Sequence, residues 1–335
     1  MKLLVTGAAG FIGNELAIKL IDMGHVVVGI DNLNDYYDVQ LKRDRLARLD
    51  GKAGFTFIQM GVEDREAMTA LAQQYQFDQI FHLAAQAGVR YSIENPYAYI
   101  DSNLVGFGNI LELARQQKVQ HLIYASSSSV YGENEQQPFS EHHPVDHPVS
   151  LYAATKKSNE VMAHAYSHLY EIPTTGLRFF TVYGPWGRPD MAPFLFTDAI
   201  MNDRPIKVFN HGNMARDFTY IDEIVDGVIK SSQAVPQKTE RPEKNTPADS
   251  SAPYQVLNIG NSSPVQLMDF IQAIENASGK TAEKLFMDMQ PGDVPVTYAD
   301  TSLLQLATGY QPSTNIQDGV NRVVEWYCQY YKKSV

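Results

Sequence analysis

The stretch Thr6-Gly7-Ala8-Ala9-Gly10-Phe11-Ile12-Gly13 carries the strongest structural signal in this chain of 335 residues. An apolar run, Lys2–Thr6, leads into it, and a segment with helical periodicity, Phe11–Met23, leaves it, so the pattern predicts a buried strand, a tight turn and a helix. The first of the three glycines permits the turn, the second lets a phosphate approach the backbone, and the third lets the helix pack against the strand. Such a turn at a helix N-terminus is typical of a site that binds a pyrophosphate.

An acidic residue stands at the end of the next predicted strand, Val26–Ile30. It is Asp31, 18 residues after Gly13, which is close to the offset of about 20 residues expected for an acid that binds a dinucleotide's ribose. An Asp at this place accepts hydrogen bonds from both ribose hydroxyls and repels a 2′-phosphate. The combination predicts a dinucleotide site that prefers NAD to NADP.

Strand and helix signals alternate outward from this unit through the first ~180 residues, which is typical of a parallel sheet covered on both faces. The further strand candidates are Phe55–Gln59, Gln79–Leu83, His121–Ala125 and Thr174–Phe179, and the helix candidates are Asp35–Leu49, Arg65–Tyr75, Pro96–Gln117 and Leu151–Tyr170. The sequence therefore predicts an α/β fold with a doubly wound parallel sheet of the Rossmann type.

The pattern becomes irregular after about Tyr183, with short strands, short helices and many Pro, Gly and Asp residues. We expect a Rossmann domain over residues 1–182 and a smaller α/β substrate-binding domain over most of 183–335, from which some segments return to the sheet. Residues 236–253 are polar and lack periodicity, so we expect a mobile insertion there. Regular signals resume with a strand, Gln255–Ile259, and two helices, Val265–Ala277 and Ile316–Tyr331.

Composition and charge exclude several classes of protein. The 27 Lys and Arg against 38 Asp and Glu leave a net charge of −11, which disfavours nucleic acid and anionic membranes as partners. No run approaches the ~20 apolar residues of a membrane span. One cysteine, Cys328, excludes a disulfide scaffold and favours a cytoplasmic protein. The cluster Glu141–His147 has no spacing that suits a metal, so we predict no metal site.

A possible catalytic pair lies on the predicted helix Leu151–Tyr170. Tyr152 and Lys156 stand at positions i and i+4, so they share one helix face. A free Tyr, with a pKa of ~10, is a poor base at neutral pH, and a neighbouring ammonium stabilises the phenolate. The serine run of Ala125–Gly132 follows a strand predicted to lie beside this helix, and its hydroxyls are suited to orient a substrate alcohol for a Tyr base.

Taken together, these motifs resemble those of a known family over nearly the whole chain. The motifs are TGAAGFIG (6–13), LAAQAGVRYS (83–92), ASSSSVYG (125–132), YAATKKSNE (152–160), RFFTVYGPWGRPDMA (178–192) and RDFTYIDEI (216–224). The chain resembles the extended short-chain dehydrogenase/reductases and, among them, the nucleotide-sugar 4-epimerases, with the closest similarity to those that act on UDP-glucuronate. This resemblance implies an isomerase of nucleotide-sugar metabolism that serves polysaccharide biosynthesis.

The resemblance also implies a mechanism. Tyr152 would take the proton of the sugar 4-hydroxyl while C4 gives hydride to bound NAD, the 4-keto sugar would turn over, and hydride would return to its opposite face. Lys156 would bind the nicotinamide ribose and tune Tyr152, and Ser127 would hydrogen-bond the 4-oxygen. In the family, long helices such as Pro96–Gln117 and Leu151–Tyr170 form a dimer interface, so a homodimer is implied.

Matching positions give the expected binding residues. The resemblance implies that NAD contacts Gly7, Gly10, Phe11, Ile12, Gly13, Asp31, Asn32, Val62, Leu83, Ala84, Ala85, Ser126, Tyr152 and Lys156. It implies that the UDP-sugar contacts Gln86, Arg90, Ser128, Thr181, Arg188, Arg216 and Asp293. Within this second set, we expect Arg188, with Arg90 as the other candidate cation, to meet the sugar carboxylate, and Arg216 to meet the diphosphate.

Two positions depart from the family pattern. Gly61 stands where many relatives have an Asp whose side chain holds the adenine, which leaves only the backbone of Val62 for that task. Gln290 stands near the place where galactose-type epimerases have an Arg, which is why the diphosphate contact is assigned to Arg216, while Asp293 would hold a uridine ribose hydroxyl.

Several alternative functions stay open at this point. A 4-epimerase of a neutral UDP-hexose, such as UDP-glucose or UDP-N-acetylglucosamine, shares all of these motifs. A 4,6-dehydratase or a UDP-glucuronate decarboxylase would carry an acid where Ser128 and Ser129 stand. A non-catalytic NAD-binding sensor would often have lost Tyr152 or Lys156, and both are present.

Overall fold

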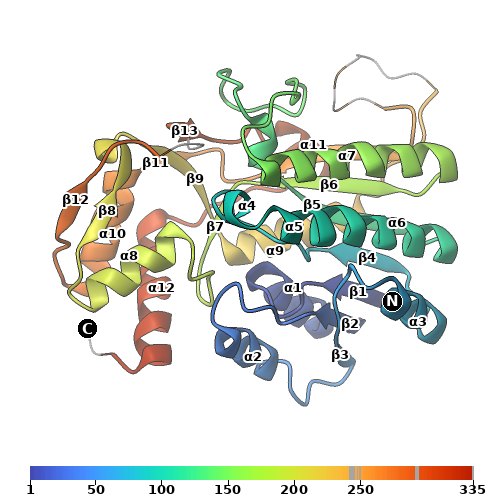
Figure 1. Cartoon of the computed structure of the whole chain (residues 1–335), viewed down its shortest axis with the longest axis horizontal. Coiled ribbons are helices and arrows are strands. Elements are labelled where there is room, and N and C mark those ends of the chain that lie inside the picture. The colour runs from blue at the N-terminus through green and yellow to red at the C-terminus, as the bar shows by residue number, and fades with distance from the viewer. Residues whose placement is uncertain (241–245, 247, 249, 291–293, 334–335) are drawn as a thin grey trace.

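A computed structural model of the chain describes residues 1–240, 246, 248, 250–290 and 294–333. Its centre is a parallel sheet of seven strands (Figure 1). In spatial order the strands are β10 (Tyr254–Ile259), β6 (Thr174–Phe179), β5 (His121–Ser127), β4 (Gln79–His82), β1 (Lys2–Thr6), β2 (Val26–Asp31) and β3 (Phe55–Gln59). The predicted doubly wound sheet is confirmed, and the strands expected at 2–6, 55–59 and 174–179 have the expected bounds.

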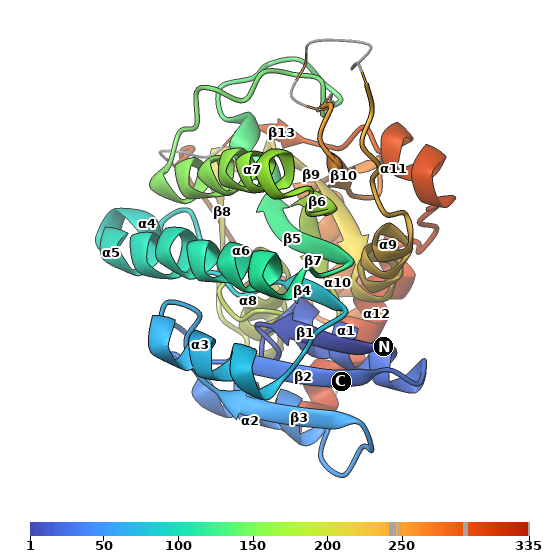
Figure 2. The same ribbon diagram turned by 90° about the vertical axis from the view of Figure 1, so that its right-hand side faces the viewer.

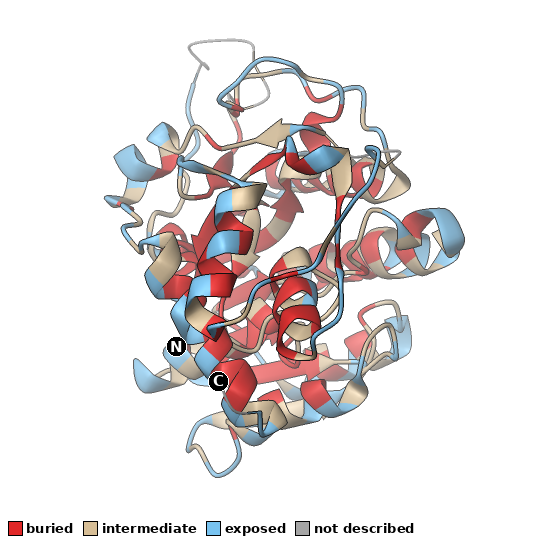
Figure 3. Ribbon diagram, turned by 90° about the vertical axis from the view of Figure 1, so that its left-hand side faces the viewer, coloured by how far each residue is buried: buried red, intermediate tan, exposed pale blue. Residues whose placement is uncertain are grey.

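Helices cover both faces of this sheet (Figure 2). One face packs against α3 (Arg65–Gln74), α6 (Gly106–Gln117) and α7 (Leu151–Tyr170), and the other against α1 (Phe11–Asp22) and α9 (Ile221–Gln233). Consecutive residues of one strand, Leu3 and Leu4 of β1, enter the two opposite apolar cores. The central strands are therefore buried on both sides, while the covering helices keep an exposed outer face (Figure 3).

The helix predicted over Pro96–Gln117 is interrupted. It consists of α5 (Pro96–Tyr99), a π-helical turn η1 (Ile100–Val105) and α6, and a short helix, α4 (Tyr91–Glu94), precedes it. The cause lies at Asn103, whose carbonyl accepts a hydrogen bond from the Asn159 side chain of α7 at 2.6 Å. The Asn103 side chain also accepts from the backbone N–H of Gln86 at 2.8 Å. The widened turn thus joins two helices to the segment after β4.

Helix α2 is shorter than the segment predicted for it. It spans Val39–Ala47, and Asp38 caps it by accepting a hydrogen bond from the backbone N–H of Gln40 at 2.8 Å. Residues 32–38 therefore form a loop after β2, which is where side chains approach the cleft described below.

The rest of the chain builds smaller sheets beside the carboxyl ends of the main one (Figure 1). They contain β7 (Thr181–Tyr183), β9 (Ala215–Tyr220), β11 (Pro264–Gln266) and β13 (Val296–Thr297), and separately β8 (Ile206–Val208) and β12 (Lys284–Phe286). The remaining elements are η2 (Ser128–Tyr131), α8 (Ala192–Met201), η3 (Phe209–Gly212), α10 (Leu267–Ser278), α11 (Ser302–Thr308) and α12 (Ile316–Tyr331).

One boundary predicted in this region was wrong. The helix expected from Val265 begins at Leu267, because Pro264–Gln266 pairs with β9 in antiparallel register. The expected return of a strand to the main sheet is seen in β10, which pairs with β6 over six residues.

The expected insertion at 236–253 lies partly outside the described residues. At its base, the backbone N–H of Thr239 donates to the carbonyl of Ser251 at 3.2 Å. The division of the chain at residue 182 stays a prediction. Within the described parts of the chain, we find no helix that is both long and apolar enough to cross a membrane.

Candidate active site

A cleft of about 1720 Å³, including its open mouth, lies at the carboxyl ends of β1, β2, β4, β5 and β6. In this sheet the chain runs outward from β1 through β2 to β3, and then returns to β4 on the other side of β1. The strand order reverses between β1 and β4, and a reversal of this kind opens a crevice at the strand ends. The fold thus produces the cleft where the glycine-rich turn also lies.

The turn after β1 forms one wall of the cleft. Gly7 has a φ of +74°, which favours glycine, and its carbonyl accepts a hydrogen bond from the backbone N–H of Gly10 at 2.9 Å. A Cβ on Gly13 would lie only 2.1 Å from the same carbonyl oxygen. Only glycine therefore permits this approach of α1 to the turn, and the first N–H groups of α1 face the cleft as an anion site.

Asp31 lies beside this turn at the end of β2. Its carboxylate accepts hydrogen bonds from the backbone N–H groups of Ala9 at 3.2 Å and Leu33 at 2.8 Å. Burial raises the pKa of Asp31, while the Leu33 hydrogen bond and the nearby charge of Lys42 act in the opposite direction. Lys42, which we did not predict, donates from Nζ to the backbone and side-chain oxygens of Asn34 at 2.7 Å and also lines the cleft.

Tyr152, Ser127 and Lys156 meet at the opposite end of the cleft. The Ser127 hydroxyl donates a hydrogen bond to Ser129 Oγ at 3.1 Å and lies near the Tyr152 phenol. Burial raises the pKa of Tyr152, and the nearby Ser127 hydroxyl and the charge of Arg188 counteract this rise. Lys156 is 2% exposed and donates from Nζ to the carbonyl of Ala125 at 2.9 Å, and burial lowers its pKa to about 8. A phenol, a hydroxyl and an ammonium thus share one water-poor corner, a set that suits proton transfer.

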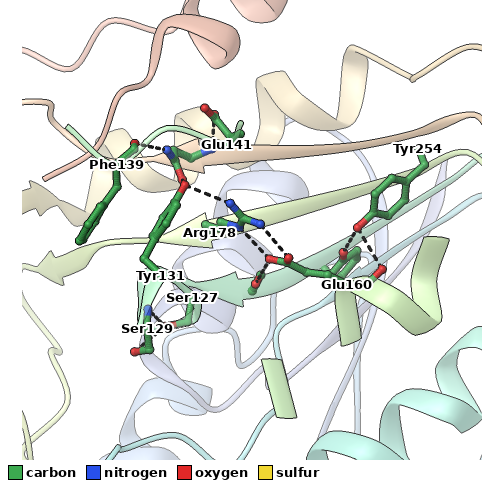
Figure 4. Close-up of polar contacts among 11 residues, drawn as sticks. Ser127, Ser129, Tyr131, Phe139, Glu141, Glu160, Arg178 and Tyr254 are labelled. Carbon is green, nitrogen blue, oxygen red and sulfur yellow. Dashed lines mark hydrogen bonds and ion pairs between the residues drawn. The ribbon is translucent and has the colours of Figure 1, made fainter. Parts of the chain in front are cut away.

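A buried ion pair lies beneath this corner (Figure 4). Arg178 of β6 donates to both carboxylate oxygens of Glu160 on α7, each at 2.8 Å. The Ser126 hydroxyl donates to Glu160 at 2.6 Å, and Arg178 also donates to the Tyr131 hydroxyl at 3.1 Å. Burial opposes the charge of Glu160, but Arg178 keeps its pKa below the usual value. The pair thus holds Ser126 and Tyr131, near the two ends of the serine segment 125–132, against α7, the helix that carries Tyr152.

Arg188 reaches the cleft from the loop after β7. Its guanidinium donates from Nε and Nη2 to Asp190, with distances of 3.1 and 2.5 Å. The same carboxylate accepts a hydrogen bond at 3.0 Å from the hydroxyl of Tyr36, which belongs to the loop after β2. Neither contact with Asp190 uses Nη1. The charge of Arg188 is close enough to Tyr152 to lower the pKa of the phenol.

The structure brings together all the residues that we predicted for the cofactor. The cleft-lining members of that set are Gly7, Gly10, Phe11, Ile12, Gly13, Asp31, Asn32, Val62, Leu83, Ala84, Ala85, Ser126, Tyr152 and Lys156. Sequence reasoning missed Tyr36 and Glu63, which line the same cleft from the loops after β2 and β3, and Lys42, which lines it from α2. The only signal for Tyr36 and Glu63 was their position shortly after predicted strands.

The residues predicted for the UDP-sugar are more dispersed. Gln86, Ser128, Thr181 and Arg188 line the cleft. Arg90 and Arg216 are not among the residues that line it: the Arg90 guanidinium is 5.4 Å from the ring centre of Phe209, and Arg216 donates to the carbonyls of Ala215 and Pro295. Asp293 lies outside the described residues.

The acid and histidine cluster at 141–147 has one buried acid, Glu141, while Asp146 and His147 are exposed. Glu141 is 1% exposed and accepts a hydrogen bond from the backbone N–H of Asn258 at 2.6 Å (Figure 4). His142 is hydrogen-bonded to Thr246 at 2.9 Å. Burial raises the pKa of Glu141 to about 7. In the residues that the structure describes, no group of three or more His, Cys, Asp or Glu side chains is arranged to hold a metal ion.

Comparison with known proteins places this geometry in a family. The chain is 59% identical to Protein CapI of Staphylococcus aureus over 99% of this chain and 100% of that protein. It is 52% identical to a probable UDP-glucuronate 4-epimerase of Rhizobium meliloti, over 100% and 99%. The crystal structure of the UDP-glucuronic acid 4-epimerase of Bacillus cereus, in complex with UDP-glucuronic acid and NAD, superposes with a TM-score of 0.87 and 34% identity, over 99% and 100%.

The sequence model of the NAD dependent epimerase/dehydratase family matches residues 3–246, which include the glycine-rich turn, the serine segment and Tyr152. The match covers more than half of the chain. The two relatives named above align with the chain over 100% and 99% of their own length. The chain belongs to the NAD dependent epimerase/dehydratase family.

Proposed function

We propose that this protein is an NAD-dependent UDP-glucuronate 4-epimerase, which interconverts UDP-glucuronate and UDP-galacturonate. The observation that carries the proposal is the convergence of Tyr152, Ser127 and Arg188 at one end of a cleft whose other end holds the glycine-rich turn. A base, a hydroxyl that orients an alcohol, and a cation that suits a carboxylate stand together there. The similarity to UDP-glucuronate 4-epimerases supports the same substrate.

The cleft fits NAD. The backbone approach at Gly13, where no Cβ has room, and the carboxylate of Asp31 beside the turn suit a pyrophosphate and the adjoining ribose hydroxyls. When bound, NAD supplies the acceptor and donor of hydride at C4 of the sugar. The chain's part is to hold it, through the turn, Asp31, and Lys156 at the nicotinamide ribose.

Tyr152 takes the proton from the 4-hydroxyl and later returns it to the 4-oxygen. Ser127 hydrogen-bonds that oxygen beside the phenol at each of the two proton transfers. The positive charge of Arg188 favours the phenolate over the phenol, which partly offsets the cost of burial. The 4-keto sugar must turn over in the same pocket between the two proton transfers.

We infer that Arg188 meets the sugar carboxylate, with the hydroxyls of Ser128 and Thr181 beside it. Nη1 of Arg188 is not used by Asp190, and a guanidinium suits a carboxylate. Pinning the carboxylate also keeps the 4-keto sugar from the geometry that expels carbon dioxide. Arg216, on β9 of the smaller sheets, is proposed for the diphosphate, and Asp293 for a uridine ribose hydroxyl. Arg90 stays the second candidate for the sugar carboxylate.

A neutral-sugar 4-epimerase is the alternative that the experiment must separate. Purified protein is given UDP-glucuronate or UDP-glucose, and formation of the 4-epimer is measured with wild type and Arg188→Ala. Because a charge-assisted contact contributes ~1.5–3 kcal/mol, kcat/KM for UDP-glucuronate should fall at least about tenfold. Residual UDP-glucose turnover should barely change, and released UDP-4-keto-pentose should rise.

The matched control is Arg204→Ala, which removes an exposed Arg paired with Asp198 on α8, away from the cleft. It should leave both activities unchanged. A wild type that prefers UDP-glucose, or an Arg188→Ala enzyme impaired equally on both sugars, would overturn the assignment.

We also propose that the protein is a homodimer. Helices α5, α6 and α7 lie side by side and carry exposed apolar side chains, among them Tyr97, Val161 and Leu169 (Figure 1). Two copies of this face would bury those side chains as a four-helix bundle. Sedimentation equilibrium should give twice the chain mass, and Val161→Glu with Leu169→Glu should give a monomer. A monomeric wild type would contradict the proposal.

A further inference from the structure

The carboxylate of Glu63 occupies the space beside Gly61. A Cβ built on Gly61 would lie 2.2 Å from Oε1 and 2.7 Å from Oε2 of Glu63. The backbone at Gly61 does not have a positive φ, so no turn requires glycine at this position. The atoms nearest to such a Cβ belong to the carboxylate of Glu63, so a side chain at position 61 would require the flexible Glu63 side chain to move. In this structure, Glu63 fills the space that a side chain at position 61 would occupy.

This position belongs to the wall of the cleft. Gly61, Val62 and Glu63 follow directly after β3, and all three line the cleft. The backbone N–H of Met60 donates to the carbonyl of Asp31 at 3.0 Å, and the Asn109 side chain donates to the carbonyl of Val62 at 2.9 Å. The segment is therefore held from both sides, next to the end of β2.

Glu63 has an unsatisfied oxygen at this place. Oε2 is buried, and none of the described residues donates a hydrogen bond to it. A buried acceptor without a donor destabilises the protein, and an ionised carboxylate can only accept hydrogen bonds. A ligand that brings an N–H or O–H group to this wall would satisfy it.

The proposed cofactor has such a group, and this step rests on the proposed function. If the pyrophosphate lies at the turn after β1 and the ribose hydroxyls at Asp31 after β2, the base attached to that ribose lies one strand further out, at the end of β3. Adenine carries an exocyclic amine, which is a hydrogen-bond donor. We propose that Glu63 holds the adenine of NAD by accepting a hydrogen bond from this amine, in place of a side chain at position 61.

The test measures binding rather than turnover. Titration calorimetry on nucleotide-free protein compares NAD with its deamino analogue, nicotinamide hypoxanthine dinucleotide, in which an oxygen replaces the amine. Wild type should prefer NAD by about ten- to a hundredfold, since the analogue turns an acceptor toward the carboxylate. Glu63→Ala should lose most of this preference. Glu63→Gln should also reduce it, because an amide can donate to the oxygen of the analogue.

Two further variants separate this role from a structural one. Glu66→Ala removes an exposed carboxylate from the first turn of α3 and should leave the preference unchanged. Gly61→Asp alone would force two carboxylates into one space and should weaken NAD binding. Gly61→Asp combined with Glu63→Ala should restore both NAD affinity and the preference for the amine.

The outcomes distinguish the two proposals. A wild type that binds NAD, with the same preference over the deamino analogue in Glu63→Ala, would overturn the role of Glu63 and leave the proposed function standing. A wild type that binds neither dinucleotide would overturn the cofactor assignment itself. Thermal unfolding of the Glu63 and Glu66 single variants should stay close to wild type, and a Glu63→Ala protein that unfolds early while keeping its preference would assign Glu63 to packing.

Discussion

The two ends of the cleft are built in different ways. At the end near β2 and β3, two carboxylates, Asp31 and Glu63, face the cleft, and Asp31 is held by backbone N–H groups. At the other end, side chains hold side chains: Ser127 donates a hydrogen bond to Ser129, and Asp190 accepts hydrogen bonds from Arg188. The first end can bind and orient a cofactor, while the second can also move protons. Substitutions at the first end should therefore change cofactor affinity, and those at the second end should change rate or substrate choice.

The largest effect that would establish this difference is expected from Tyr152→Phe. Loss of the phenolic hydroxyl removes the general base, which contributes roughly 10²–10⁴-fold to rate. We expect kcat to fall by that factor, with affinity for NAD and for UDP-glucuronate close to wild type. Steady-state kinetics and calorimetry measure the two quantities separately. A variant with near-normal kcat would assign the proton transfer to another group.

Lys156→Met should reveal how much the buried ammonium group lowers the free energy of unfolding. The pKa of Lys156 is lowered from 10.5 to about 8, so between these values the unfolded chain binds a proton that the native protein does not. This group therefore makes wild-type stability rise with pH in that window. The variant lacks this effect. The free energy of unfolding of the variant minus that of wild type should therefore be larger at pH 7 than at pH 10, by on the order of 3 kcal/mol. Urea unfolding of nucleotide-free protein measures this difference.

Lys156→Met also removes the hydrogen bond to Ala125, which adds a loss of ~1 kcal/mol that does not depend on pH in this range. Only the difference between the two pH values is therefore diagnostic. A constant offset at both pH values would contradict a depressed pKa.

Asp31→Ala should act at the other end of the cleft. The variant loses the acceptor for the ribose hydroxyls, so NAD affinity should fall by about ten- to a hundredfold. It also loses the charge that repels a 2′-phosphate, so the ratio of NAD to NADP affinity should move toward one. Calorimetry with both dinucleotides is the measurement. An unchanged ratio would show that another group sets the preference.

The smallest effect is expected from Asp190→Asn. Asparagine keeps the shape but weakens the hold on Arg188, so kcat/KM for UDP-glucuronate should fall about three- to tenfold while that for UDP-glucose stays unchanged. Tyr36→Phe, which removes one hydrogen bond to Asp190, should show a milder form of the same selective loss. Asp190→Glu is the control that retains the charge. A rise in activity on UDP-glucuronate would show instead that Asp190 competes for Arg188.

Much of the fold and the reacting end of the cleft could be predicted because their signals are local. The strand ends of the main sheet follow buried apolar runs, and Tyr152 and Lys156 follow from one turn of helix. Glycines 7, 10 and 13 act within a few residues of one another. Each of these features depends on backbone geometry over fewer than ten residues, which the printed sequence displays directly.

The contacts that were missed join distant parts of the chain. Tyr36 and Asp190 are 154 residues apart in sequence, and their contact depends on how the loops after β2 and β7 approach each other. Glu63 is close to Gly61 in sequence, but the turn of its side chain over Gly61 depends on the path of the backbone after β3. Likewise, Val265 and Gln266 share the helical periodicity of α10, and pairing with β9 overrides it.

The pairing of β10 with β6 has a consequence for how the chain is made. The main sheet is complete only after Tyr254–Ile259 has been synthesised, some 75 residues after β6. Until then β6 is an open edge, with unpaired backbone groups beside an already formed nucleotide-binding half. A nascent chain at that stage is exposed to edge-to-edge aggregation through β6. The pairing of β10 with β6, late in translation, removes this open edge.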